Sequence, residues 1–271
     1  MNPDRIAGDD QFAAEEHTIA LYRHALQERF PLPPQKKSRR PAIAGLALCL
    51  LAAGLVWLDP AYRSEQFATA IGEQQQFRLA DGSQVSLNTD TAMRISWHLR
   101  SRDVDLQRGQ VLFDVTSERW RPFQVRAAHT KVHVLGTRFE VWRHADAVHV
   151  TVLRGRVKVS GAGGNTELGP GQQVVAHAGA FTPVRLVDAA RTSSWQNGKL
   201  VFDRVPLRDA LQEVQRYSRH TISLDDPALG ELLVSGMFDA THAEAVLDLL
   251  PTILPVTLRR DTSGTIHVAA R

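Results

Sequence analysis

Residues 132–159 read VHVLGTRFEVWRHADAVHVTVLRGRVKV, and apolar residues occupy every second position of several short runs in this stretch. These positions are Val132 and Val134, then Val148, Val150 and Val152, then Val157 and Val159. An alternation with a period of two is typical of a β-strand that buries one face. Leu135-Gly136 and Arg154-Gly155 lie between the runs and are typical of turns. The stretch therefore predicts short strands joined by tight turns.

The same pattern continues on both sides, from Gln66 to about Pro183. Further alternating residues are Val85 and Leu87, and then Val111, Phe113 and Val115. Further turn signals are Asp81-Gly82, Arg108-Gly109 and Gly169-Pro170-Gly171. No helical periodicity interrupts the pattern, so we expect an all-β domain over residues 59–188, either a sandwich or a solenoid of short rungs.

The period changes from about Ser194 onward. The expected strands are LVFDRV (200–205), ISLDD (222–226), LLVSGMF (232–238), PVTLRR (255–260) and TIHVAA (265–270), the last two forming a hairpin around Ser263-Gly264. One expected helix aligns Leu207, Leu211, Val214 and Tyr217, and a second aligns Ala245, Leu249 and Ile253, with Pro251 cutting or kinking it. The order βαββαββ predicts a small α+β domain over residues 189–271, which folds as a separate unit.

An uncharged segment, PAIAGLALCLLAAGLVWL, covers residues 41–58. Eighteen residues in a helix span roughly 27 Å, close to the hydrocarbon thickness of a bilayer. Trp57 lies at the far boundary, where an indole ring contacts both lipid and water. We expect a single transmembrane helix here, and the alternatives are a cleaved signal peptide and a buried soluble helix. The forty preceding residues are too many for an ordinary signal-peptide n-region.

Basic residues flank this segment on its N-terminal side, at Lys36, Lys37, Arg39 and Arg40. By the positive-inside rule, residues 1–40 lie in the cytoplasm and residues 59–271 lie outside, in the periplasm of a Gram-negative cell. The expected location is the inner membrane, with a cytoplasmic N-terminus and a periplasmic C-terminus.

The N-terminal tail carries one amphipathic helical pattern. The apolar stripe comprises Phe12, Ile19, Tyr22, Leu26 and Phe30. A lone helix cannot bury such a stripe against itself. It must contact a cytosolic partner, the membrane surface or a copy of itself.

Composition and motifs argue against catalysis and bound groups. The net charge is +3 and the only cysteine, Cys49, lies in the uncharged segment, so no internal disulfide or CxxC site can form. GxSxG, Walker A, HExxH and GxGxxG motifs are absent. His129 and His133 would lie about 13 Å apart on a strand, too far to share one metal ion. His144 and His149 could meet across a turn, more as a solvated hairpin than a metal site. We expect no enzyme, no cofactor, no metal and no direct contact with nucleic acid.

Several segments together resemble the FecR family. They are TAIGEQQQFRLADGSQVSLNTDT (69–91), VDLQRGQVLFDV (104–115), RPFQVRA (121–127), VHVLGTRFEVW (132–142) and VTVLRGRVKV (150–159). The segments SWQNGKLVFDRVPLRDALQEVQRYSRHTISL (194–224) and LLVSGMF (232–238) are similar to the family's C-terminal domain, which in turn is similar to the short N-terminal modules of secretins and TonB-dependent receptors. With the uncharged segment, the resemblance covers roughly residues 41–271.

The resemblance implies an inner-membrane regulator of signal transduction. Such proteins relay a signal from a TonB-dependent outer-membrane receptor, through its signalling domain, to a cytoplasmic extracytoplasmic-function sigma factor, as anti-sigma factors or as activators. Periplasmic and intramembrane proteases often carry the signal, here by cuts within residues 59–68 and near Gly45 or Gly54. The alternative is a periplasmic scaffold protein that does not contact a sigma factor.

Contact residues follow from these expectations. The tail stripe, Phe12, Ile19, Tyr22, Leu26 and Phe30, would contact the sigma factor. A free edge strand in the C-terminal domain would accept the receptor by strand addition. The candidate strands, LVFDRV (200–205) and LLVSGMF (232–238), contribute Leu200, Phe202, Leu233, Val234 and Phe238.

Overall fold

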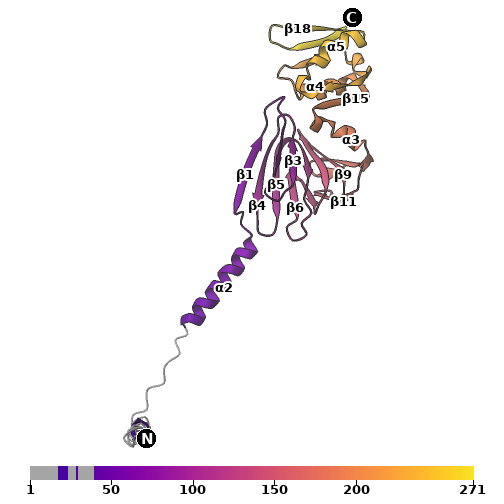
Figure 1. The fold of residues 1–271 in the computed structure, drawn as a ribbon. Helices are drawn as coiled ribbons and strands as arrows, with labels where there is room; N and C mark the ends of the chain where they lie inside the picture. The colour runs from indigo at the N-terminus through magenta and orange to yellow at the C-terminus, as the bar shows by residue number, and fades with distance from the viewer. Residues whose placement is uncertain (1–17, 24–28, 30–39) are drawn as a thin grey trace, which may run out of the picture. The chain divides into compact units, whose positions relative to one another are not determined.

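The computed structural model describes residues 18–23, 29 and 40–271. The chain divides into two compact units, residues 1–55 and residues 56–271. Residues 18–23 are helical, and helix α2 covers Arg40–Leu58 (Figure 1). In the described parts of the chain we find no helix with the length and apolar character that crossing a membrane requires.

Helix α2 is apolar around its whole circumference, because its sequence holds no charged residue after Arg40. Its large apolar side chains that the structure describes are exposed, and these are Leu48, Leu50, Leu51, Val56, Trp57 and Leu58. A helix that is apolar on every side is typical of a helix surrounded by a protein core or by lipid.

Residues 63–186 form fourteen short and medium strands. Their bounds are β1 Arg63–Ala68, β2 Gln75–Arg78, β3 Gln84–Leu87, β4 Ala92–Trp97, β5 Arg102–Asp114, β6 Phe123–Ala127, β7 Thr130–Val134, β8 Arg138–His144, β9 Ala147–Arg154, β10 Val157–Gly161, β11 Gly164–Leu168, β12 Gln172–His177, β13 Ala180–Phe181 and β14 Arg185–Leu186. The alternating valines and phenylalanines that predicted these strands are buried, and they share one hydrophobic core. We call residues 59–188 the β domain.

The strands form one curled sheet, in which β5 belongs to both halves (Figure 1). The first part of β5 pairs with β4 and, in parallel, with β6, whereas its second part pairs with β3 and β8. The order through the sheet is β11-β10-β7-β6-β5-β8-β9-β12-β13. A continuous curled sheet therefore takes the place of the expected sandwich or solenoid.

The expected turn at Arg108-Gly109 is wrong. Residues 102–114 form a single strand of thirteen residues, and Gly109 lies inside it with a φ of +87°. The ladder to β4 shifts by one residue just before this point, between the pairs Ala92–Arg108 and Met93–Leu106. A bulge of this kind bends a strand without ending it. The other expected glycine turns lie between consecutive strands.

Residues 189–271, which we call the C-terminal domain, follow the expected order βαββαββ. The elements are α3 Ala189–Thr192, η2 Ser194–Asn197, β15 Lys199–Pro206, α4 Leu207–Gln215, β16 Ile222–Leu224, η3 Pro227–Glu231, β17 Leu233–Asp239, η4 Ala240–His242, α5 Ala245–Ile253, β18 Val256–Arg260 and β19 Ile266–Ala270. Strands β15 and β17 pair with each other, and β19 lies between β16 and β18. The domain has a hydrophobic core of its own, distinct from that of the β domain.

The expected buried face of α5 is wrong. Leu249 and Ile253 are exposed, whereas the helix buries Val246, Leu247 and Leu250. Both sets recur at helical spacing, but only the second combines the i, i+1 and i+4 positions that make a broad apolar stripe. Pro251 does not end the helix before Ile253. A proline so close to the C-terminal end of a short helix removes only one helical hydrogen bond.

Candidate functional site at the domain junction

The outer face of strand β8 carries the site. Phe139 and Val141 point into the β core, so that Glu140 and Trp142 point to the opposite face. That face would be exposed in an isolated β domain. Here the segment after β14 and the end of α4 cover it, and Glu140 is only 2% exposed.

Glu140 receives its hydrogen bonds from neutral groups. The Trp195 indole Nε1 donates to Glu140 Oε2 at 2.7 Å, and the Gln110 side chain makes a second hydrogen bond. Burial raises the pKa of Glu140 to about 7, because a low-dielectric environment disfavours the charged carboxylate. These two hydrogen bonds and the nearby Arg216 guanidinium act in the opposite direction. Glu140 therefore titrates within the physiological range.

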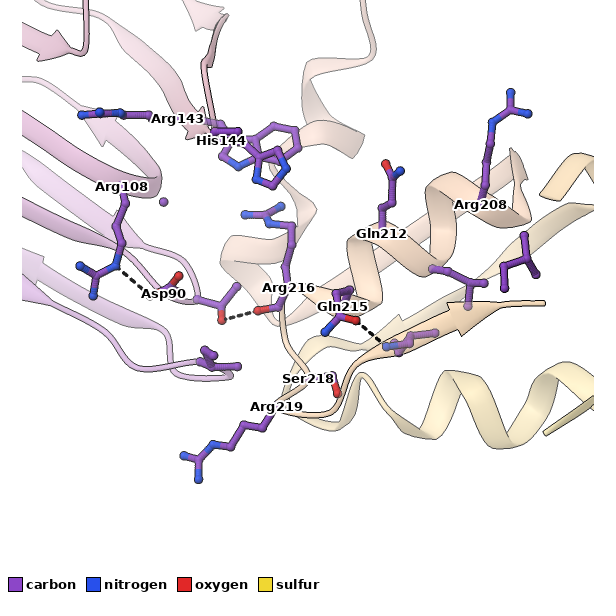
Figure 2. A pocket seen from close by; sticks show the side chains of 18 residues that line it. Asp90, Arg108, Arg143, His144, Arg208, Gln212, Gln215, Arg216, Ser218 and Arg219 are labelled. Atoms are coloured by element: carbon purple, nitrogen blue, oxygen red, sulfur yellow. Dashed lines mark hydrogen bonds and ion pairs between the residues drawn. The ribbon is translucent and has the colours of Figure 1, made fainter. Parts of the chain in front are cut away.

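Arg216, which follows α4, is the central cation of the junction. Its Nη1 donates to both carboxylate oxygens of Glu213, at 2.7 and 2.9 Å, so its charge is already paired within its own domain. Its Nη2 donates to Gln110 Oε1 at 2.6 Å, and its guanidinium lies 4.5 Å from the Trp142 ring centroid. Figure 2 shows Arg216 between the β-domain strands and the helix of the C-terminal domain.

A chain of buried hydrogen bonds continues from Gln110 across the junction. Asn88 Nδ2 donates to Gln110 Oε1 at 2.8 Å, and the Tyr217 hydroxyl donates to Asn88 Oδ1 at 2.9 Å. Thr89 Oγ1 donates to the Arg216 carbonyl oxygen at 2.9 Å. Burial raises the pKa of Tyr217, which keeps its hydroxyl a neutral donor. The polar groups on the two sides thus satisfy one another, and such a network specifies one docking geometry.

Two cavities border this network, and Trp142 and Arg216 line both of them. Their volumes are about 790 Å³ and about 540 Å³. In the larger one, the guanidinium groups of Arg108, Arg143 and Arg208 lie around the rim and point away from Arg216 (Figure 2). They do not converge on one point, so the arrangement does not form a cradle for a phosphate group.

The expected sigma-factor contacts lie in the N-terminal unit. Ile19 and Tyr22 belong to the helical residues 18–23 and are 58% and 67% exposed. Phe12, Leu26 and Phe30 lie outside the described residues. Both described members of the stripe are therefore accessible to a partner.

The two strands expected to accept the receptor, β15 and β17, pair with each other in register Leu200–Phe238. Leu200, Phe202 and Val234 are buried in the C-terminal core, and Phe238 packs against it. Leu233 is 47% exposed. Strand addition would therefore use a backbone edge, with Leu233 as the one exposed side chain of the expected set.

The two histidines expected to meet at the β8–β9 hairpin both contact Trp142. Its ring centroid lies 5.5 Å from that of His144 and 4.7 Å from that of His149. Burial lowers the pKa of His149 to about 4, which keeps this ring neutral. No group of three or more potential metal ligands comes together within the described part of the chain.

Sequence reasoning missed the junction residues Gln110, Glu140, Trp195 and Arg216. Polar residues that alternate with buried valines predict a solvent-facing strand surface, and nothing local distinguishes a face that another domain covers. The one usable signal was Glu140 beside Trp142 on the outward face of β8, since a tryptophan is rarely left in water.

Glu140 should make the stability of the joined β and C-terminal domains depend on pH. Its pKa is about 7 in the folded protein and 4.5 in an exposed chain, so the folded state binds more protons between these values. Its contribution is fully present below pH 4.5 and is lost as the pH rises to about 7, which amounts to roughly 3 kcal/mol at most. In urea unfolding experiments, the unfolding free energy of wild type should fall relative to that of Glu140→Gln as the pH rises between these values, because glutamine does not titrate.

His149 also titrates in this pH range, so the effect of Glu140 must be measured as the difference in unfolding free energy between wild type and Glu140→Gln. Its pKa is about 4 in the folded protein, against an ordinary value of 6.5, so its contribution falls as the pH falls through this range. The two groups oppose each other in wild type. If the difference in unfolding free energy between wild type and Glu140→Gln did not change from pH 4.5 to 7, Glu140 would not be buried as the structure has it.

The geometry defines a two-domain class of protein, in which a curled β-sheet and a small βαββαββ domain meet through a buried polar junction. Residues 65–158 match the family described as FecR protein, which confirms the resemblance. The matched stretch runs from within strand β1 to the start of β10.

Solved structures are similar to a longer stretch of the chain. Two crystal structures of a putative anti-sigma factor from Parabacteroides distasonis ATCC 8503 are similar to 77% and 76% of this chain, at 26% identity. Their TM-scores are 0.64 and 0.65, and the similarity covers 100% and 99% of those chains. Among curated proteins, none matches this sequence.

Proposed function

We propose that this protein is a single-pass inner-membrane signal transducer that regulates a cytoplasmic sigma factor in response to an outer-membrane receptor. The observation that carries the proposal is the similarity of 77% of the chain, including the FecR domain, to the solved putative anti-sigma factor. The other parts of the proposal rest on particular features of this chain.

The uncharged segment 41–58 would be the membrane anchor. It follows a cluster of four basic residues and carries Trp57 next to its far end, as a signal anchor with a cytoplasmic N-terminus does. The exposed apolar side chains of α2 support this assignment, since lipid would cover them. The periplasm would then hold residues 59–271.

The C-terminal domain would receive the signalling domain of a TonB-dependent receptor. Support comes from β15 and β17, because each has only one strand neighbour among the described residues and so leaves an edge for strand addition. A partner on this domain would act on the junction through Arg216 and Trp195, which join it to the β domain. Cleavage by proteases within residues 59–68 would then transmit the change across the membrane.

The tail would contact an extracytoplasmic-function sigma factor through its apolar stripe. Replacing Tyr22 and Leu26 by aspartate should abolish that contact, because two carboxylates cannot be buried in an apolar groove without partners. We expect regulation of sigma-dependent transcription to be lost, measured with a reporter gene in cells that carry the full-length protein.

The matched control adds the same two charges away from the stripe, as Ala20→Asp with His24→Asp. This pair has the same spacing of four residues and should leave regulation intact. Unchanged regulation in Tyr22→Asp with Leu26→Asp would contradict the tail contact. Deleting residues 2–30 separates the proposal from a scaffold role, since a scaffold would keep its periplasmic partners and lose no transcriptional output.

Crosslinking of the full-length protein in its native membrane tests the whole proposal. A sigma factor and an outer-membrane receptor should copurify with it. Recovery of periplasmic proteins alone would favour the scaffold.

A further inference from the structure

Two loops of the β domain meet beside the residue that directly follows α2. Asp59 Oδ1 accepts hydrogen bonds from the backbone amides of Leu99 and Arg100, at 2.9 and 3.3 Å. The Asp59 carbonyl oxygen lies 2.6 Å from His98 Nδ1. The loop between β4 and β5 is therefore fastened to the point where the chain leaves the helix.

The loop between β5 and β6 lies against the first one. Arg121 Nη2 donates to the His98 carbonyl oxygen at 2.9 Å and to the Tyr62 hydroxyl at 3.0 Å. The Arg102 amide also donates to the Pro122 carbonyl oxygen at 3.0 Å. Tyr62 and both loops thus form one surface at this end of the β domain.

This surface exposes large apolar and aromatic side chains. Trp120 is 90% exposed, Tyr62 is 60% exposed and Leu99 is 58% exposed. A single exposed apolar residue is ordinary, but three on adjoining segments, including a nearly bare tryptophan, indicate a contact surface.

The charges around this surface are mainly basic. Arg100 and Arg119 are exposed at its edge. The acidic residues there are already engaged: Asp59 with the loop amides and Arg100, and Glu118 with the buried Arg102 at 3.7 Å. Arg119 has no acidic partner among the described residues. Arg100 meets Asp59 only at 3.9 Å and its side chain is 61% exposed, so both guanidinium groups can also contact an anionic partner.

We propose that Tyr62, Leu99 and Trp120 rest in the headgroup region of the bilayer, with Arg100 and Arg119 against anionic phosphates. The inference rests on the proposed membrane anchor. Tyr62 follows Leu58 by four residues, so it lies within about 14 Å of the end of the span. Tryptophan and tyrosine side chains favour the interface between lipid and water, and arginines there bind anionic lipid. Docking in this way would also cover the juxtamembrane residues 59–68 against a protease.

Spin labels on the full-length protein in vesicles of phosphatidylethanolamine and phosphatidylglycerol test this contact. One label is placed on the native Cys49, one on Leu99→Cys and one on Met237→Cys, the last two in a Cys49→Ala background. Met237 is 67% exposed on β17 and serves as the matched exposed control. The measurement is the relative access of oxygen, which concentrates in lipid, and of a water-soluble nickel chelate.

The label at position 99 should collide more with oxygen than with nickel, as the label at Cys49 does, and the label at position 237 should show the reverse. Adding Trp120→Ser should return the label at 99 to the aqueous pattern. Arg100→Gln and Arg119→Gln should each reduce the ratio of docked to undocked label about fivefold on anionic vesicles. Neither substitution should change this ratio on vesicles of phosphatidylcholine alone, which carry no net negative charge.

A lipid signal at Cys49 with an aqueous signal at 99 would overturn the inference and leave the anchor standing. Aqueous signals at both would overturn the anchor itself. A label at 99 that neither oxygen nor nickel reaches would mean that a protein covers the surface, which would also overturn the contact with lipid.

Discussion

Gly109→Ala should destabilise the β domain by roughly 3–5 kcal/mol, because the new methyl group meets backbone atoms that cannot move aside. A Cβ at this position would lie 2.3 Å from Thr91 Oγ1, 2.5 Å from Thr91 Cα and 2.7 Å from the Asp90 carbonyl oxygen. The φ of +87° adds a further penalty for any L-residue with a side chain. Gly109 lies where β5 passes from one half of the curled sheet to the other, so the strain acts on the whole domain. Urea denaturation of the full-length protein measures the loss.

Gly171→Ala is the matched control. Its φ is +74°, close to that of Gly109, but the nearest atom to the new Cβ would be the Val187 carbonyl oxygen at 3.8 Å. Only the conformational penalty of roughly 1–2 kcal/mol should remain. Equal losses in the two variants would mean that the close approach of β5 to Thr91 is not as the structure shows.

Asp81→Asn should cost roughly 3 kcal/mol, because it leaves the buried Arg102 without its closest countercharge. Asp81 Oδ2 lies 2.5 Å from Arg102 Nη1, and their side chains are 6% and 0% exposed. The asparagine is isosteric but has one acceptor oxygen, whereas Asp81 Oδ1 accepts from the Ser83 amide and Oδ2 accepts from Ser83 Oγ and Arg102, so the loss combines the missing charge with a missing acceptor. Arg102 also holds the Arg121 carbonyl oxygen at 2.9 Å, so the loss should loosen the loop that carries Trp120 as well.

The control is Asp90→Asn, which breaks the pair between Asp90 and Arg108 at 2.8 Å, whose side chains are 52% and 57% exposed. Water screens this pair, and at most about 1 kcal/mol should be lost. In a double-mutant cycle, Asp81→Asn with Arg102→Met should be less destabilising than the sum of the single changes, since no unpaired charge remains. Additive losses would show that the two side chains do not form the buried pair.

Local pattern was sufficient for most of the secondary structure. Strands such as β7, β9 and β10 bury alternate valines, and this period is a property of the extended backbone itself. The βαββαββ order of the C-terminal domain followed in the same way, because helix and strand periods differ. The prediction from local pattern was wrong at two places. In α5, two different sets of apolar residues recur at helical spacing, and at Gly109 the sequence of a bulge resembles that of a turn.

By itself, the sequence determined the strands of the β domain, the order of elements in the C-terminal domain and the resemblance to FecR, since each depends on residues close together in the chain. Only the tertiary structure decided that the sheet curls around β5, that Glu140 is buried beneath Trp195, and that Leu99 and Trp120 share one surface. The physical reason is distance along the chain. Glu140 and Trp195 are 55 residues apart, and whether a polar strand face meets water or another domain is a property of packing that neither segment carries alone.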